Sequence, residues 1–180
     1  MWDLEQLPIK NEEFDAILSW GVVEHFVEGP HKVLREMYNA LRPGGFLFIT
    51  VPYRNMICRS PLLWILERTK RVFWIRKIFG KGEYKETFFE YTFGRKTFIN
   101  ILKSTGFLPL CIFPLSHEVG FVRYWNRHFY LFRRNPKFFC QSKTERWQGL
   151  TKTGNWICGL LKRISPWFTP DQIFCIAKRV

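Results

Sequence analysis

The sequence has few acidic residues, no paired cysteines and no long apolar runs, and each scarcity excludes a class of protein. Its five cysteines are odd in number, widely spaced and never in a Cys-x-x-Cys pair, which argues against a disulfide framework and against a zinc site. Apolar runs such as residues 46–49 are far too short to span a membrane, and the acidic opening is unlike a signal peptide. We therefore expect a cytoplasmic protein with reduced cysteines.

The shortage of acidic residues is local. The net charge is +13, but residues 54–81 carry +7 and residues 120–168 carry +9, so the rest of the chain is slightly negative. Both basic segments are also rich in aromatic residues. A basic and aromatic composition predicts contact with an acidic, partly apolar partner.

What is present is a pattern of strands and helices in a chain that is 47% hydrophobic and long enough for one core over residues 1–180. Residues 14–19 and 46–51 are short apolar runs, typical of buried strands. Between them a helix is predicted through residue 42, because a Pro-Gly-Gly run follows and apolar residues recur at helical spacing: Val33, Leu34, Met37, Tyr38 and Leu41. Strand, helix and strand in this order form a parallel crossover unit.

The second half predicts fewer core elements and two insertions. A helix over residues 96–105 with Gly106 as its stop, a strand over 107–113 and a last strand over 173–177 belong to the core. The insertions cover about residues 53–93 and 116–168, and the first contains an amphipathic helix candidate near residues 62–71. The fold class is therefore α/β, with two basic aromatic helical insertions.

Five segments in order resemble the class I S-adenosylmethionine-dependent methyltransferases, in the group called type 11. The sequence Asp3-Leu4-Glu5-Gln6-Leu7-Pro8-Ile9 is similar to the segment after the family's third strand. Residues 14–25 resemble its fourth strand and Glu-His turn, residues 41–52 its Arg-Pro-Gly-Gly and fifth strand, Gly106-Phe107 the pair before its sixth strand, and residues 172–178 its seventh. The resemblance implies a partial Rossmann-like sheet, mostly parallel with an antiparallel last strand, and S-adenosylmethionine as cofactor.

The sequence departs from the family in one respect. The family builds its cofactor site on a glycine-rich loop after the first strand and an acidic residue ending the second, and neither occurs ahead of Asp3. The sequence thus resembles the C-terminal portion of a methyltransferase, and we expect the chain alone to be inactive. We also expect the backbone edge of the strand over residues 14–19 to be open.

The resemblance assigns four cofactor-binding residues. Asp3 would accept a hydrogen bond from the adenine amino group, and Leu4 would present its backbone to the ring. Ser19 and Trp20 would contact the methionine part of the cofactor. A solvated loop at Asp3 and a core position for Trp20 are the simpler alternatives.

His25 is the candidate general base, because imidazole can take a proton from a hydroxyl or amine at neutral pH. A structural hydrogen-bonding role is the alternative. Some ubiquinone-pathway methyltransferases of the family bind a divalent metal through Glu-x-x-Glu-His, but Gly21 stands here in place of the first glutamate, before Glu24 and His25. We therefore predict no metal.

The insertions fall where the family places its substrate lid. Their aromatic residues would line a pocket for a small or lipid-linked acceptor, and their basic residues would hold a phosphate or an anionic membrane surface. A solvated lid is the plain alternative, and nucleic acid is less favoured because no nucleic-acid-binding motif accompanies the charge. The predicted function is methyl transfer to such an acceptor, and the alternative is a non-catalytic module that binds an anionic surface.

Overall fold

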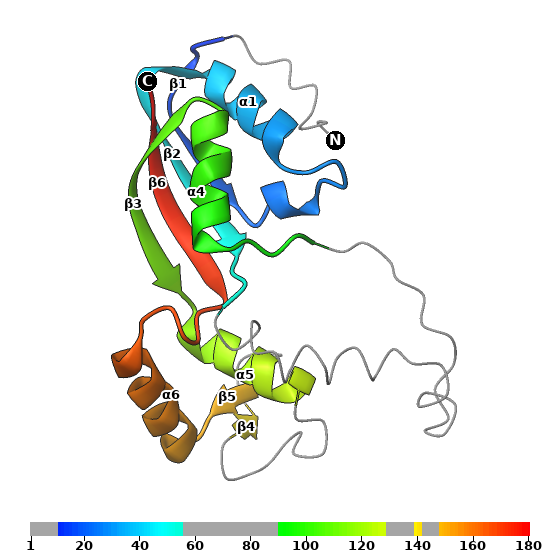
Figure 1. Ribbon diagram of the computed structural model, residues 1–180, viewed down its shortest axis with the longest axis vertical. Coiled ribbons are helices and arrows are strands. Elements are labelled where there is room, and N and C mark those ends of the chain that lie inside the picture. Colours follow the sequence, from blue (N-terminus) through cyan, green and yellow to red (C-terminus); the bar gives the residue numbers. More distant parts are fainter. Residues whose placement is uncertain (1–10, 56–89, 129–138, 142–147) are drawn as a thin grey trace, which may run out of the picture. The chain divides into compact units, whose positions relative to one another are not determined.

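The computed structural model describes residues 11–55, 90–128, 139–141 and 148–180 (Figure 1). The predicted amphipathic helix near residues 62–71 lies outside these ranges. The chain divides into two compact units. The sheet unit comprises Met1–Tyr53, Phe88–Leu115 and Gln172–Val180, and the helical unit comprises Arg54–Thr87 and Ser116–Asp171.

The sheet unit contains a four-stranded mixed sheet in the order β1-β2-β6-β3 (Figure 1). Its strands are β1 (Phe14–Trp20), β2 (Leu41–Pro52), β3 (Phe107–Leu115) and β6 (Gln172–Arg179). β1 runs parallel to β2, and β6 is antiparallel to both β2 and β3. The parallel crossover and the antiparallel last strand are thereby confirmed. β1 lies at one edge, and within the described ranges no other strand pairs with its outer side.

The first helix is shorter than predicted. α1 (His31–Ala40) ends two residues before residue 42, where the Leu41 N–H reaches the Met37 carbonyl and Leu41 turns to extended backbone. Proline disfavours helical backbone at the residue before it, so Arg42 leaves the helix. Leu41 pairs with Phe14 and the next pair joins Phe46 to Ala16, so residues 42–45 bulge out of the sheet. The second helix, α4 (Arg95–Ser104), and the strands β3 and β6 lie within two residues of their predicted bounds.

The two faces of the sheet differ. α1 and α4 cover one face (Figure 1), where the fully buried core residues are Val33, Leu34, Leu47, Ile49, Val51, Phe98, Leu102, Ile173, Cys175 and Ala177. Each strand–helix–strand crossover of this kind is right-handed, so both helices fall on the same side. On the other face the Phe174 ring of β6 contacts three aromatic rings: Phe48 of β2, Phe113 of β3 and Trp20 of β1. The helix-covered face is therefore the hydrophobic core of the sheet unit.

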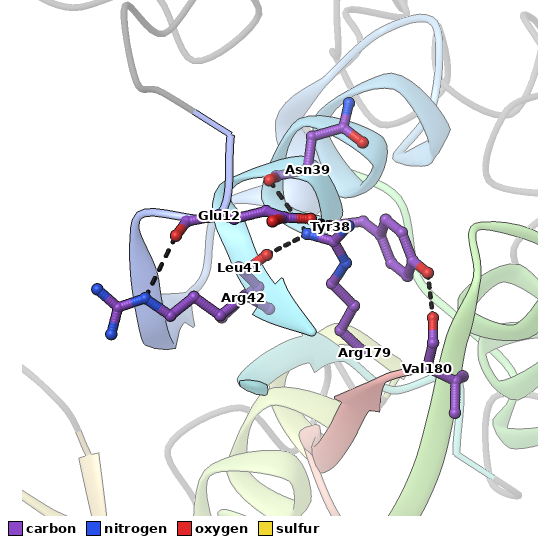
Figure 2. Close-up of polar contacts among 7 residues, drawn as sticks. All are labelled: Glu12, Tyr38, Asn39, Leu41, Arg42, Arg179 and Val180. Atoms are coloured by element: carbon purple, nitrogen blue, oxygen red, sulfur yellow. Dashed lines mark hydrogen bonds and ion pairs between the residues drawn. The ribbon is translucent and has the colours of Figure 1, made fainter. Parts of the chain in front are cut away.

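Arg179 ties the end of β6 to the amino ends of β1 and β2 (Figure 2). Its guanidinium donates to the carbonyls of Asn39 and Leu41 and pairs with the Glu12 carboxylate at 3.0 Å. The same group lies 4.7 Å from the centre of the Tyr38 ring, whose hydroxyl donates to the Val180 carbonyl. A cation at the end of a helix satisfies carbonyls that have no partner within the helix. This network closes the end of the sheet unit opposite to the carboxyl ends of β1 and β2.

The helical unit contains α5 (His117–His128), β4 (Phe139–Gln141), β5 (Gln148–Leu150) and α6 (Lys152–Ile164). Phe121, Leu150 and Cys158 form its small buried cluster, with Val122, Ile157 and Leu161 packed around them. The helices agree with a helical second insertion, but the antiparallel β4–β5 pair was not predicted. In the portion that the structure describes, no helix combines the length and the apolar character that crossing a membrane requires.

Candidate functional site

The carboxyl ends of β1 and β2 meet at one edge of the sheet, where open α/β sheets bind their ligands. Ser19 and Trp20 pair with Ile49 and Thr50 in the parallel register. The Gly21 N–H then donates to the Thr50 hydroxyl at 3.2 Å. Gly21 has a φ of +65°, which favours glycine, and the chain turns there into the short 3₁₀ helix η1 (Val23–His25). This turn fixes η1 next to the strand ends.

Ser19 carries an unsatisfied hydroxyl at this edge. The residue is only 2% exposed, and its Oγ has no hydrogen-bond partner among the described residues. Buried polar atoms are nearly always hydrogen-bonded, and an exception calls for an explanation such as a ligand. Ser19 is therefore available to a bound group.

Glu24, His25 and Glu90 come together beside this edge. Their potential ligand atoms all lie within 4.8 Å of one another. Two hydrogen bonds of Tyr91 bring Glu90 there, because the Tyr91 N–H donates to the Glu24 carbonyl at 2.9 Å and the Tyr91 hydroxyl donates to the Val27 carbonyl at 2.6 Å. The result is an imidazole with two carboxyl groups at the mouth of the sheet.

The Glu24 carboxyl is the most unusual group of this cluster. It is 2% exposed, and its Oε2 has no hydrogen-bond partner within the described part of the chain. Burial raises the pKa of Glu24, and the nearby Glu90 carboxylate raises it further, against the lowering by its own backbone N–H and by His25. The protonated form of Glu24 is thus favoured more than in water, and it can donate a hydrogen bond as well as accept one.

The structure places the predicted site residues in three groups. Ser19 and His25 lie at the carboxyl end of β1, with Ser19 buried and His25 exposed in η1. The Trp20 ring lies on the opposite face of the sheet from the helices and contacts Phe174. Asp3 and Leu4 lie outside the described residues. The cofactor roles of all four residues stay predictions.

Two residues of the site were missed at the level of sequence: Thr50 and Glu90. Thr50 is a polar residue two positions before the end of the apolar strand β2. Glu90 lies in the insertion over residues 53–93, and the pairing of Tyr91 with η1 and of Phe93 with Pro52 holds the adjoining backbone near His25. With Glu24 and His25 it offers two carboxylates and an imidazole, a set of groups that can ligate a divalent cation. The absence of a first glutamate at Gly21 therefore does not by itself decide whether a metal binds.

The first part of the chain is similar in sequence to known methyltransferases. Residues 2–49 match the family model of the methyltransferase domain. The tRNA U34 carboxymethyltransferase of Campylobacter curvus is 39% identical over 56 residues, which cover 31% of this chain and 18% of that protein.

Solved structures match nearly the whole chain at low identity. A Bacillus halodurans C-125 protein assigned to the methyltransferases superposes with a TM-score of 0.54 at 13% identity, over 99% of this chain and 69% of its own. A methyltransferase from Methanosarcina mazei superposes with a TM-score of 0.50 at 12% identity, over 99% of this chain and 65% of its own. The [4+2]-cyclase SpnF gives 0.51 at 15% identity, over 99% and 54%. The chain thus spans from about half to about two thirds of the length of these structures.

The α/β sheet with its antiparallel last strand is part of a Rossmann-like methyltransferase fold. Residues 2–49 are thus similar to the methyltransferase domain, and the sheet matches part of the methyltransferase fold. The cofactor of this family is S-adenosylmethionine. The residues at the carboxyl end of β1 fit such a group, because the Ser19 hydroxyl is buried there with no hydrogen-bond partner among the described residues and Gly21 forms a tight turn beside it.

Proposed function

We propose that this protein transfers the methyl group of S-adenosylmethionine to a small or lipid-linked acceptor. The observation that supports the cofactor site most directly is the buried Ser19 hydroxyl at the carboxyl end of β1, which has no hydrogen-bond partner in the portion of the chain that the structure describes. Ser19 would bind the methionine part of the cofactor, and Trp20 would contribute its backbone, because its ring packs against Phe174. On the family resemblance, Asp3 and Leu4 would contact the adenine.

When bound, the cofactor supplies a methyl group on a positively charged sulfur that a nucleophile can displace in line. The chain's own residues position that nucleophile and remove its proton. In this proposal His25 accepts the proton of an acceptor O–H or N–H as the new bond to the methyl carbon forms. The carboxyl groups of Glu24 and Glu90, each with one oxygen within 4.8 Å of an imidazole nitrogen, would orient the ring.

The second candidate function is a non-catalytic module that binds an anionic surface. It is favoured by the two basic segments rich in aromatic residues, residues 54–81 and 120–168, which carry +7 and +9. The first proposal concerns transfer by the protein together with the rest of the family's fold, of which this chain spans only part.

Calorimetric titration of the protein with S-adenosylhomocysteine separates the two functions. Micromolar binding that Ser19→Ala weakens supports the methyltransferase, and no binding supports the module. The role of His25 is tested in the protein together with the rest of the family's fold, by transfer of a labelled methyl group from S-adenosylmethionine into a lipid extract and into a small-molecule extract.

We expect His25→Gln to lower that transfer about a hundredfold or more and to leave the affinity for S-adenosylhomocysteine unchanged. His31→Gln is the matched control, because His31 is an exposed histidine on α1 outside the cluster. Equal transfer by the two variants would exclude His25 as the base.

A further inference from the structure

α6 in the helical unit has two apolar faces, and only one of them is packed. Its inner face places Cys158 in the buried cluster with Phe121 and Leu150. The other face exposes three large apolar side chains, with exposed fractions of 68%, 44% and 67%: Trp156, Leu160 and Ile164. A surface helix of a globular protein usually has polar residues on the face away from its core. The packing of the residues that the structure describes in this unit therefore does not explain the exposed face of α6.

The exposed apolar residues form a continuous stripe with cations beside it. Trp156, Leu160 and Ile164 are four residues apart, so they lie above one another on successive turns. With a helical advance of about 100° per residue, the exposed Lys152 and Arg163 fall on the same side of the helix as Trp156. We call these five residues the α6 stripe: Lys152, Trp156, Leu160, Arg163 and Ile164.

The α6 stripe has no acidic residue on its own helix and has open space beside it at Gly159. No Asp or Glu occurs anywhere in α6. A Cβ built at Gly159, which lies next to the stripe, would have no atom within 4 Å. The stretch of chain that contains α6, residues 120–168, carries a charge of +9. The stripe thus combines apolar side chains that leave water with a positive charge around them.

We propose that the α6 stripe docks in the interface of an anionic lipid membrane, with the helix lying in the membrane plane. Tryptophan and aliphatic side chains bury in the boundary between headgroups and acyl chains, while Lys and Arg reach the anionic headgroups. The charge complementarity favours a lipid surface with negative headgroups over an uncharged one.

Nucleic acid fits the stripe less well, because bases stack on aromatic rings and two of the three apolar residues are aliphatic. The three apolar side chains would bury apolar area in lipid in any arrangement along the helix. A protein partner would instead need a surface complementary in shape to them. The docking proposal stands without methyl transfer. If the docking proposal and the methyl-transfer proposal both hold, the α6 stripe brings the protein to an acceptor that resides in the membrane. The acceptor would then be lipid-linked.

Vesicle sedimentation of the full chain tests the proposal. We use phosphatidylcholine vesicles with and without about one third phosphatidylserine, and expect sedimentation with the anionic vesicles only. Trp156→Ser should weaken this binding about tenfold to a hundredfold, because a partly buried indole is lost. Arg163→Gln should weaken it about fivefold, which is the effect of one cation at an anionic surface.

Matched controls come from the sheet unit. Val27→Ser removes an apolar side chain whose exposed fraction, 67%, is close to the 68% of Trp156. Arg35→Gln removes an exposed cation of α1 and is the control for Arg163→Gln. Neither should change vesicle binding. All four positions are exposed, so thermal unfolding monitored by circular dichroism should give the same midpoint for each variant.

Three results would overturn the proposal. The first is equal binding to neutral and anionic vesicles, or none to either. The second is a loss of binding in Val27→Ser as large as in Trp156→Ser. The third is another occupant of the stripe: a dimer that Trp156→Ser converts to a monomer in size-exclusion chromatography, or single-stranded RNA that displaces the vesicles. The titration with S-adenosylhomocysteine is independent of lipid, so its failure and the failure of this proposal are distinguishable.

Discussion

Replacing Ser19 by alanine should separate folding from cofactor binding. The Ser19 hydroxyl is buried at the end of β1 and has no hydrogen-bond partner in the described part of the structure. Burying a hydroxyl without a partner costs about 1–3 kcal/mol. The alanine variant removes that cost and leaves the remaining packing in place, so its free energy of unfolding should rise by about 1 kcal/mol. A hydrogen bond from Ser19 to the bound cofactor would be lost at the same time, and the affinity for S-adenosylhomocysteine should fall about two- to twelvefold.

Urea unfolding and calorimetric titration measure the two effects on the same protein. Thr105→Val is the matched control, because the Thr105 hydroxyl is also buried but donates to the carbonyls of Ile101 and Leu102. That variant loses a satisfied hydrogen bond, so it should be less stable by about 0.5–1.5 kcal/mol and bind S-adenosylhomocysteine normally. A Ser19→Ala protein that is destabilised as much as Thr105→Val would show that the Ser19 hydroxyl has a structural partner, and would refute the reasoning.

Three further predictions concern the two units. Gly120→Ala should destabilise the protein by about 1–3 kcal/mol in urea unfolding, because the added Cβ would lie 2.1 Å from a backbone oxygen. Gly159→Ala should instead stabilise α6 by about 0.5–1 kcal/mol, because nothing lies within 4 Å of its added Cβ. Equal effects of the two substitutions would contradict this. Burial and a nearby lysine lower the pKa of His117 below its ordinary 6.5, so at this residue the unfolded chain binds more protons than the folded one. The stability of the protein should therefore fall as the pH drops below about 6.5. Thermal midpoints measured between pH 5 and pH 8 should fall less for His117→Gln than for the unsubstituted protein. Mg²⁺ and Mn²⁺ should not change the affinity for S-adenosylhomocysteine, because the raised pKa of Glu24 favours a protonated carboxyl that ligates weakly. Elemental analysis that finds stoichiometric metal in the protein and none in Glu90→Gln would contradict this and make the cluster of Glu24, His25 and Glu90 a metal centre.

The strands and helices of the sheet unit were predictable because their signals are local. The apolar runs over residues 14–19 and 46–51 became the adjacent, parallel strands β1 and β2. The end of α1 was misplaced because helical periodicity continues to Leu41, whereas the backbone restriction before Pro43 acts on Arg42. The direction of β6 came from the family resemblance alone, since an apolar strand pattern carries no information on its direction.

The candidate site was predictable only where its residues follow a strand directly. Ser19 and His25 could be placed at the carboxyl end of β1 because the crossover pattern defines that end. Glu90 could not, because 65 residues separate it from His25 and its position depends on the backbone pairing of Tyr91 with Glu24. Long-range pairing of this kind leaves no periodic signal in the sequence.

The position of Glu90 also decides how the cluster works. In η1 alone, Glu24 and His25 are neighbours in sequence, and a buried carboxyl beside an exposed imidazole would give the ring one acidic neighbour. Glu90 adds a second carboxyl within 4.8 Å and contributes to raising the pKa of Glu24. Two carboxyl groups so close together do not both ionise as readily as either alone, so one favours a proton while the other can stabilise an imidazolium. The insertion after β2 therefore supplies part of the proposed proton-transfer site, and a change in that insertion should alter transfer to the acceptor before it alters binding of the cofactor.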